Sequence, residues 1–321
     1  MKRTYTGGAA LLVLAVTLVG CTAPVENDET AAPDELTSII VGVAPSTLSA
    51  PLYLAEELGY FEEQGLDVSL ETITSGAEAV PRVLSGEMAF TMSGVAETLE
   101  ARNNGVDLIM VGNYAIGPSD EERDYFGIIA LDDSIQTVDD LAGKNVAVNV
   151  LSGGTVATAN AGIEAAGGDP SLINYVEVPS PQQVDAVANG TVDAAVALEP
   201  FVTLGLDSGM HLILRPQVGG VAGMPSVALI SSTSYVDDNP EVVEAFLAAV
   251  AEANRYANEN LEEAREISVY TGLDAELLAR INLPQWSDEP TEWDRIDDLV
   301  ELLLSQGILS QEPDLSTAIA D

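Results

Sequence analysis

The sequence predicts an α/β fold of two lobes with a helical C-terminal tail. Short apolar runs of the β type alternate with helical patterns between Ile39 and Arg215. This alternation is typical of βαβ units, in which helices cover mostly parallel sheets. After Pro225 one further apolar run is followed by helical stretches only. The chain of 321 residues is long enough for two lobes of ordinary domain size.

The predicted strands are the short apolar runs, taken in chain order. They are Ile39–Ala44, Leu66–Thr72, Met88–Met92, Leu108–Gly112, Phe126–Leu131, Asn145–Val150, Tyr175–Val178, Ala194–Leu198, His211–Leu214 and Val227–Ile230. The predicted helices between them are Pro51–Leu58, Ala77–Leu84, Thr155–Ala166 and Gln182–Ala188.

The tail after residue 230 is predicted to be helical throughout. Asn239 and Pro240 suit the cap and the first turn of a helix, and apolar residues then recur every three or four positions. Further helices are predicted at Ala275–Ile281 and Trp293–Leu304. We expect this tail to pack over the first lobe.

A short pattern occurs twice and hints at two lobes built on one plan. In each copy two valines three residues apart are followed by a glycine three residues later, before a predicted strand. The copies are Val80, Val83 and Gly86, and Val184, Val187 and Gly190. The glycines fall where a helix needs a left-handed C-terminal cap. The alternative explanation is that many helix-to-strand connections in α/β proteins show such a pattern.

The first 20 residues resemble a signal peptide. Lys2 and Arg3 precede an apolar stretch from Gly7 to Val19, which is shorter than the roughly 20 residues that span a bilayer. Leu18–Cys21 resembles a bacterial lipobox, so we expect lipid attachment at Cys21 and an extracytoplasmic, membrane-anchored protein. A spectator cysteine is the alternative. Residues 21–37 are predicted to form the lipidated N-terminus and a flexible tether.

The charge balance is strongly acidic. Asp and Glu number 52 against 11 Lys and Arg, for a formal charge of −41. The acids are dispersed along the chain, which is typical of surfaces adapted to high salt, where screening removes self-repulsion. Plain solubility is the alternative interpretation. Without a basic patch to meet phosphates, the composition argues against nucleic-acid binding.

Four stretches carry a resemblance to a known family. The most specific is Pro51–Val68, whose sequence is PLYLAEELGYFEEQGLDV. The others are Thr74–Ala77 (TSGA), Leu141–Val148 (LAGKNVAV) and Val192–Phe201 (VDAAVALEPF). In this order and spacing they resemble the nitrate, sulfonate, taurine and thiamine-precursor (NMT1/THI5-like) family of ABC transporter substrate-binding proteins.

The resemblance implies the periplasmic binding protein fold of type II. Two lobes would be joined by two crossover strands, near Tyr125–Ala130 and Pro216–Ser226, and would close on a small-molecule ligand. Lobe 1 would comprise residues 38–125 and 225–321, and lobe 2 residues 126–216. Gly219, Gly220 and Gly223 would serve as a hinge or form only a mobile loop. The implied partners are an ABC permease and an ATPase, and we expect a monomer.

Ligand-binding residues are expected in loops beyond the carboxyl ends of strands, where helix N-termini offer free amides. The candidates are Ser46, Thr47, Ser75, Gly76, Ser93, Gly94, Ser152, Gly153, Gly154 and Thr155. Ordinary helix capping is the alternative role of each hydroxyl. Glu199 could receive an ammonium group or cap a helix, and Phe201 could stack on the ligand. We expect a sulfonate, nitrate, taurine or thiamine-precursor class of ligand.

The sequence argues against an enzyme. His211, the only histidine, begins an apolar strand and suits a structural role, and Cys21 is assigned to the anchor. We therefore expect no catalytic residue, no metal site and no cofactor. A ligand-sensing module for a membrane receptor, or an enzyme on the same fold, remains the alternative.

Overall fold

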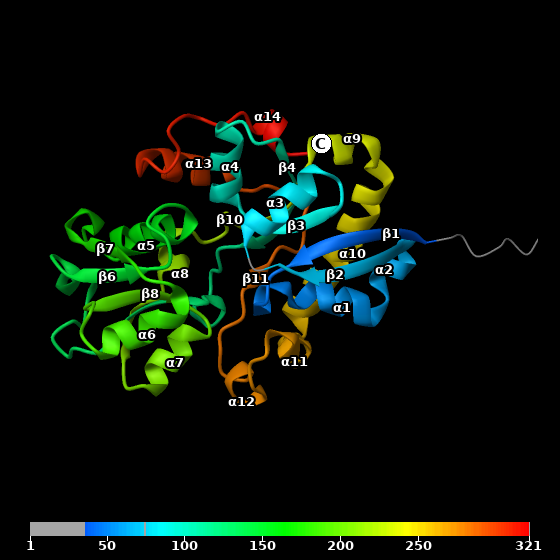
Figure 1. Cartoon of the computed structure of the whole chain (residues 1–321). Helices are drawn as coiled ribbons and strands as arrows, with labels where there is room; N and C mark the ends of the chain where they lie inside the picture. The colour runs from blue at the N-terminus through cyan, green and yellow to red at the C-terminus, as the bar shows by residue number, and fades with distance from the viewer. Residues whose placement is uncertain (1–35, 74, 321) are drawn as a thin grey trace, which may run out of the picture. The chain divides into compact units, whose positions relative to one another are not determined.

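The computed structural model describes residues 36–73 and 75–320. The expected signal peptide, Cys21, most of the expected tether and Thr74 lie outside the described residues. Within the described ranges the chain forms two separate sheets flanked by helices (Figure 1), which confirms the predicted α/β class. No helix in these ranges combines the length and the apolar character that a membrane span requires.

The first sheet has the strand order β11-β4-β10-β3-β1-β2. Its strands are β1 (Thr37–Val43), β2 (Leu66–Thr72), β3 (Phe90–Gly94), β4 (Leu108–Ile116), β10 (Pro225–Ser232) and β11 (Gln285–Trp286). β1 pairs in parallel with β2 and β3, whereas β10 runs antiparallel to β3 and β4. β4 extends past the predicted end at Gly112, and the two-residue strand β11 is too short to leave a periodic pattern.

The second sheet has the order β7-β6-β8-β5-β9. Its strands are β5 (Phe126–Ala130), β6 (Asn145–Val148), β7 (Asn174–Glu177), β8 (Ala194–Leu198) and β9 (His211–Leu214). β6 is parallel to β7 and β8, and β5 is antiparallel to β8 and β9.

Both sheets are mixed, whereas the sequence predicted mostly parallel ones. The reason lies in the two passages of the chain between the sheets. β10 enters the first sheet where β4 leaves it, with Pro225 opposite Ile116, and β5 starts opposite the end of β8, with Phe126 facing Leu198. A strand that enters at the end where its neighbour stops must run antiparallel to it.

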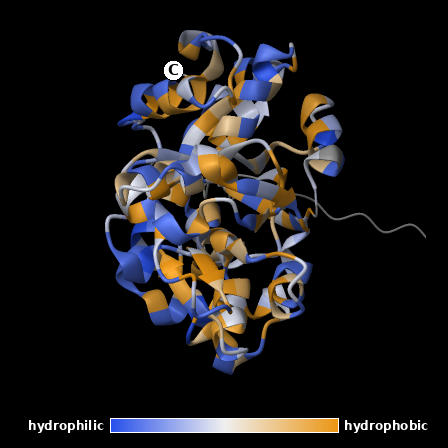
Figure 2. Ribbon diagram, turned by 90° about the vertical axis from the view of Figure 1, so that its left-hand side faces the viewer, coloured by the Kyte–Doolittle hydropathy of each residue, from blue (hydrophilic) through white to orange (hydrophobic). Residues whose placement is uncertain are grey.

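Helices cover the faces of both sheets. Around the first sheet lie α1 (Ala50–Leu58), α2 (Tyr60–Glu63), α3 (Gly76–Leu84), α4 (Val95–Asn103), α9 (Thr233–Asp238), α10 (Pro240–Glu259), α11 (Leu261–Ile267), α12 (Ala275–Leu278), α13 (Ile296–Ser305) and α14 (Leu315–Ala318). Around the second lie α5 (Gly154–Ala165), α6 (Ser180–Ala188), α7 (Phe201–Asp207) and α8 (Pro216–Gly220). Short 3-10 helices are η1 (Thr47–Ser49), η2 (Glu121–Arg123), η3 (Val138–Leu141), η4 (Pro170–Leu172) and η5 (Ser268–Thr271). Many of the helices contain both hydrophobic and hydrophilic residues (Figure 2). This mixture is typical of helices that pack one face on a sheet and expose the other to solvent.

Aromatic side chains fill the core between the first sheet and the tail. Phe90 of β3 stacks on Phe246 of α10, with ring centroids 4.3 Å apart. Tyr114 and Trp286 are buried, and each donates a hydrogen bond of 2.9 Å to the carbonyl oxygen of Leu48. The tail thus packs over the first sheet, as the sequence predicted.

The tail also contacts a helix of the second sheet. The side chain of Asn160 on α5 donates to Oε1 of Gln306, at the end of α13, over 3.0 Å. The side-chain Nε2 of Gln306 donates a hydrogen bond to the carbonyl oxygen of Ala157 over 3.3 Å. The C-terminal segment therefore bridges elements that belong to both sheets.

Residues 117–125 lead from β4 to β5, and residues 215–224 lead back from β9 to β10. The outward passage therefore precedes the predicted Tyr125–Ala130, most of which is strand β5. The two passages are hydrogen-bonded to each other: the Gly117 amide donates to Met224 O over 2.9 Å, and the Gly223 amide donates to Gly117 O over 2.7 Å. Gly219 and Gly220 lie in helix α8 and not in a mobile loop. A Cβ on Gly220 would stand 2.5 Å from the amide nitrogen of Gly162 in α5, so this glycine permits close helix packing.

The repeated valine–glycine pattern falls on matching places in the two sheets. Gly86 follows α3 with φ +73°, and Gly190 follows α6 with φ +74°. Both glycines adopt the left-handed conformation that the sequence predicts, because it reverses the chain from a helix toward a strand.

Candidate functional site

A cavity of about 210 Å³ lies among elements that belong to both sheets. It is bordered by the junction of β3 and α4, the first turns of α5, the start of β5, the end of β8, helix α8, the start of β10 and one residue of α13. The lining residues that carry polar groups or aromatic rings are Glu97, Tyr125, Phe126, Thr155, Thr158, Gln217 and Ser226. Apolar side chains, including Leu198, Val221 and Met224, supply much of the remaining wall.

The most direct contact across this site joins α4 to α5. The amide of Gly154 donates a hydrogen bond of 2.8 Å to Oε1 of Glu97. Glu97 stands in the first turn of α4, and Gly154 opens α5, so the carboxylate meets a free amide at the positive end of a helix dipole. Glu97 is the only charged residue among the described residues that line the cavity.

Glycines make room for the Glu97 carboxylate. A Cβ on Gly153 would lie 2.5 Å from Oε1 of Glu97, and a Cβ on Gly94 would overlap the same carboxylate. Gly153 also has a backbone φ of +95°, which residues with a side chain rarely adopt. The two glycine-containing loops thus let a carboxylate from one side reach the backbone of the other.

Gln217 of α8 forms another part of the cavity wall. Its side chain is 1% exposed and lines the cavity, and its Oε1 has no hydrogen-bond partner among the described residues. Burial raises the pKa of Tyr125, and the carboxylates of Asp124 and Glu97 add to this rise, so the hydroxyl stays protonated at neutral pH.

Asp124 anchors this wall from behind. Its carboxylate accepts the amides of Phe126, Gln217 and Val218 over 3.0, 2.8 and 3.2 Å. It thereby ties the outward passage of the chain to the returning one. Burial raises the pKa of Asp124 to about 6, although the three amides and the charge of Arg215 oppose the rise.

The structure brings three of the predicted ligand-binding residues to the cavity, namely Gly94, Gly154 and Thr155. Gly153 lies beside them against Glu97. Ser93 precedes this group, and its hydroxyl accepts a 3.0 Å hydrogen bond from Thr98. Ser152 is exposed and does not line the cavity.

The other predicted loop residues lie away from the cavity lining. Thr47 is buried in η1, and the carbonyl of Ser46 accepts a 2.8 Å hydrogen bond from the hydroxyl of Tyr270. Ser75 and Gly76 are exposed at the start of α3.

Glu199 and Phe201 also stand outside the cavity lining. The Glu199 carboxylate accepts the Thr203 amide over 3.0 Å at the start of α7, and its side chain is 2% exposed. It also lies 3.8 Å from the guanidinium of Arg215. Burial raises its pKa, against the opposing effects of these partners. Phe201 is half-buried and packs against the core of the second sheet.

Sequence reasoning missed Glu97, Tyr125, Gln217 and Ser226. Glu97 follows the predicted Ser93–Gly94 loop by only three residues, but an acid in the first turn of a helix is so common that it carries no functional signal. Gln217 sits in a segment whose helix was not predicted. Each becomes part of a site only because distant loops meet.

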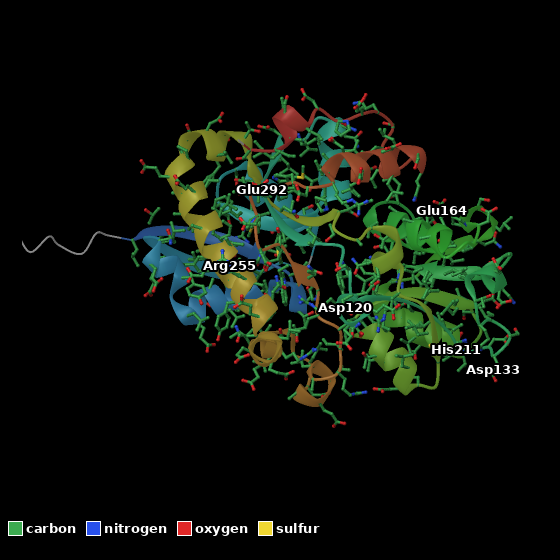
Figure 3. The ribbon with its side chains drawn as sticks, turned by 180° about the vertical axis from the view of Figure 1, so that it is seen from behind. Asp120, Asp133, Glu164, His211, Arg255 and Glu292 are labelled. Carbon is green, nitrogen blue, oxygen red and sulfur yellow. The ribbon has the colours of Figure 1, made fainter. Side chains whose placement is uncertain are left out.

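The described residues hold no cluster of three or more His, Cys, Asp or Glu side chains that could bind a metal ion. His211 lies on the edge strand β9, where Nε2 is 2.6 Å from the carbonyl oxygen of Ile135 (Figure 3). It is not among the residues that line the cavity.

Comparison with known proteins establishes the family. Residues 46–264 match the family model described as NMT1/THI5 like. The chain belongs to the NMT1/THI5-like family. The match covers the segments on which the resemblance rested, and it includes every described residue proposed for ligand binding.

Curated proteins similar to this NMT1/THI5-like chain include a binding protein and an enzyme. The formylaminopyrimidine-binding protein of Halalkalibacterium halodurans is 23% identical over 261 residues, which are 80% of this chain and 76% of that protein. The 4-amino-5-hydroxymethyl-2-methylpyrimidine phosphate synthase of Aspergillus parasiticus is 26% identical over 226 residues. These residues are 64% of this chain and 62% of the synthase.

A solved structure confirms the predicted periplasmic binding protein fold. The periplasmic aliphatic sulphonate binding protein SsuA from Escherichia coli superimposes with a TM-score of 0.70 at 18% identity. The superposition covers 90% of this chain and 93% of that chain.

Proposed function

We propose that this protein is the extracytoplasmic solute-binding lipoprotein of an ABC importer. The observation that carries the proposal is a small, partly apolar cavity lined from both sheets of a periplasmic binding protein fold. Such a cavity suits reversible capture, because a ligand there contacts both sides at once. The binding function in the names of two similar proteins supports the same interpretation.

The proposed lobes follow the two sheets. Lobe 1 comprises residues 38–125 and 225–321, and lobe 2 comprises residues 126–216. We propose that ligand contacts to both lobes favour a closed form, and that the closed form docks on an ABC permease with its ATPase. A sensing role for a membrane receptor is the alternative, and the partner that is recovered with the protein decides between them.

We propose binding and not catalysis at this site. The cavity contains no histidine, cysteine or lysine among the described residues that line it, so an activated nucleophile with a base is not assembled there. One similar protein is a pyrimidine phosphate synthase, so the experiment must also look for conversion of the ligand to a product.

The test is titration calorimetry of the full chain, purified in detergent. The panel includes 4-amino-5-hydroxymethyl-2-methylpyrimidine, taurine, ethanesulfonate, nitrate and simple amines. One class should bind with a stoichiometry of one and be recovered unchanged. Conversion of the bound solute to a product, detected by mass spectrometry, would refute a pure binding function.

Lipid anchoring at Cys21 is a separate proposal that rests on the lipobox resemblance. Wild-type protein should partition with membranes and carry the mass of an attached lipid. Cys21→Ser should abolish the added mass, and globomycin should block processing of the wild type. A mature protein without added lipid mass contradicts the anchor.

A further inference from the structure

We infer that the cavity selects a small organic cation with N–H donors, and that Glu97 is the specificity residue which rejects anions. This inference rests on the proposed solute-binding function and revises the expectation of a sulfonate or nitrate ligand. It follows from four features of the cavity, taken in turn.

The first feature is that the natural anion site is already occupied by a side chain. α5 runs for 12 residues and begins at the cavity, so its first amides would ordinarily attract an anion. The Gly154 amide instead donates to Glu97 over 2.8 Å. A sulfonate or nitrate placed there would lose this amide and face a like charge at short range.

The second feature is that no cationic residue of the described chain lines the cavity to offset Glu97. Arg215, the arginine nearest in sequence to the lining residue Gln217, has other partners. Its guanidinium donates to the carbonyl oxygens of Asp124 and Phe126 over 2.8 and 2.7 Å and approaches Glu199. Glu97 is exposed to solvent, so an anionic ligand would meet a partly screened like charge, and no cationic side chain among the described lining residues would offset that repulsion.

The third feature is a buried acceptor that lacks a donor. Oε1 of Gln217 is buried and unpartnered among the described residues, in a side chain that lines the cavity. Unpaired buried acceptors are rare in folded proteins, and because Oε1 has almost no accessible surface, a ligand N–H would pair with it once the amide group turns toward the cavity. Oε2 of Glu97 offers a second, charged acceptor for the same ligand.

The fourth feature is aromatic lining beside these acceptors. Tyr125 and Phe126 both line the cavity, and their rings meet edge to face with centroids 5.0 Å apart. The face of such a ring attracts a cation, most strongly where water is excluded. An ammonium or amidinium group in the cavity would thus lie near a carboxylate, an amide side chain and two aromatic rings.

The experiment compares solutes of similar size and opposite charge. The full chain is titrated with benzylamine, ethanolamine and agmatine, with benzoate, ethanesulfonate and nitrate, and with neutral 4-amino-5-hydroxymethyl-2-methylpyrimidine, all at one ionic strength. We expect an amine to bind and the anions not to bind.

Variants then assign the effect to Glu97. Glu97→Gln should weaken amine binding at least tenfold and allow weak binding of benzoate. Glu100→Gln, on the same helix but outside the cavity lining, is the matched control and should leave amine binding unchanged. Unchanged melting temperatures verify folding, and Glu97→Ala provides a second variant if Glu97→Gln is unstable.

Each outcome decides one of the two claims. An anion that binds the wild type while no amine does overturns the inference and leaves the solute-binding function standing. Neutral pyrimidine binding that is the same in wild type and Glu97→Gln, with no amine binding, also overturns it. If no solute of any charge binds, or if a solute is converted to product, the proposed function itself fails.

Discussion

Thr155 and Ser152 differ in their position relative to the cavity, so together they test its proposed role. Both were predicted ligand contacts from one glycine-rich loop. Thr155 lines the cavity, whereas Ser152 is exposed outside it. Thr155→Val removes the hydroxyl group and should weaken ligand binding about 3- to 10-fold. This is the loss in affinity expected when one hydrogen bond between protein and ligand is removed. Calorimetry of Ser152→Ala, which should bind like wild type, is the control; equal losses in both variants would contradict the placement.

Asp124 predicts a pH dependence of stability. Its pKa rises from the ordinary 3.8 to about 6 in the folded protein, so the folded state binds this proton more tightly than the unfolded chain. Its contribution to stability is therefore greatest at low pH and declines as the pH rises through about 6, by roughly 2–3 kcal/mol.

Urea denaturation of wild type and Asp124→Asn, at several pH values between about 4 and 7, measures this contribution. The wild type should lose stability relative to the variant as the pH rises. Asp120→Asn removes an exposed charge from the same segment and serves as control. A constant difference between wild type and Asp124→Asn would show that Asp124 does not titrate in this range.

At the scale of helices, the packing of α8 on α5 depends on glycine. A Cβ on Gly220 would stand 2.5 Å from Gly162 N, whereas a Cβ on Gly219 would meet only Ala165 Cβ at 3.4 Å. Gly220→Ala should therefore destabilise the protein by about 1–3 kcal/mol through overpacking. Gly219→Ala should be neutral or stabilise by up to about 1 kcal/mol, because alanine favours helix. Chemical denaturation distinguishes the two, and equal effects would contradict this packing.

Elements were more predictable than the site, and the reason is physical. β2, β8 and β9 have the bounds that the sequence predicted, because each is an apolar run with local turn signals beside it. α8 was not predicted, because its proline and two glycines are typical of loops. Glu97 and Gln217 could not have been selected, since their proposed roles depend on segments about 120 residues apart in sequence that meet only in the fold.

The whole molecule carries an excess of acidic groups over its surface. Exposed Asp120, Asp133, Glu164 and Glu292 lie in four separate segments of the described chain (Figure 3). Their mutual repulsion should be relieved by salt. We expect the melting temperature to rise by on the order of 5 °C between dilute buffer and about 1 M NaCl, where the Debye length is about 3 Å.

The shape of the salt response identifies its cause. Screening should be nearly complete by about 1 M, so the curve should flatten above that concentration. A gain that continues linearly at higher salt would indicate salting-out of apolar surface instead. No gain at all would favour plain solubility as the reason for the acidic composition.

The proposed closure of the lobes is tested at the scale of the whole molecule. Labels at Glu164→Cys and Glu292→Cys, with Cys21→Ser, place one probe on α5 and one in the tail. Pulsed electron resonance should show a narrower distance distribution when solute is bound, because ligand contacts favour one population. Glu97→Ala should broaden the distribution of the empty protein, since the bond to Gly154 is lost. Identical distributions in all states would contradict closure.

The pairing of Gly117 with Met224 and Gly223 would limit how the proposed lobes move. Two connecting segments without mutual contacts would let one lobe rotate about several axes. Two segments that are hydrogen-bonded side by side bend easily in one direction only. The opening motion should therefore have a single axis. Each time the protein shuts, a membrane partner would meet the same surface in the same orientation.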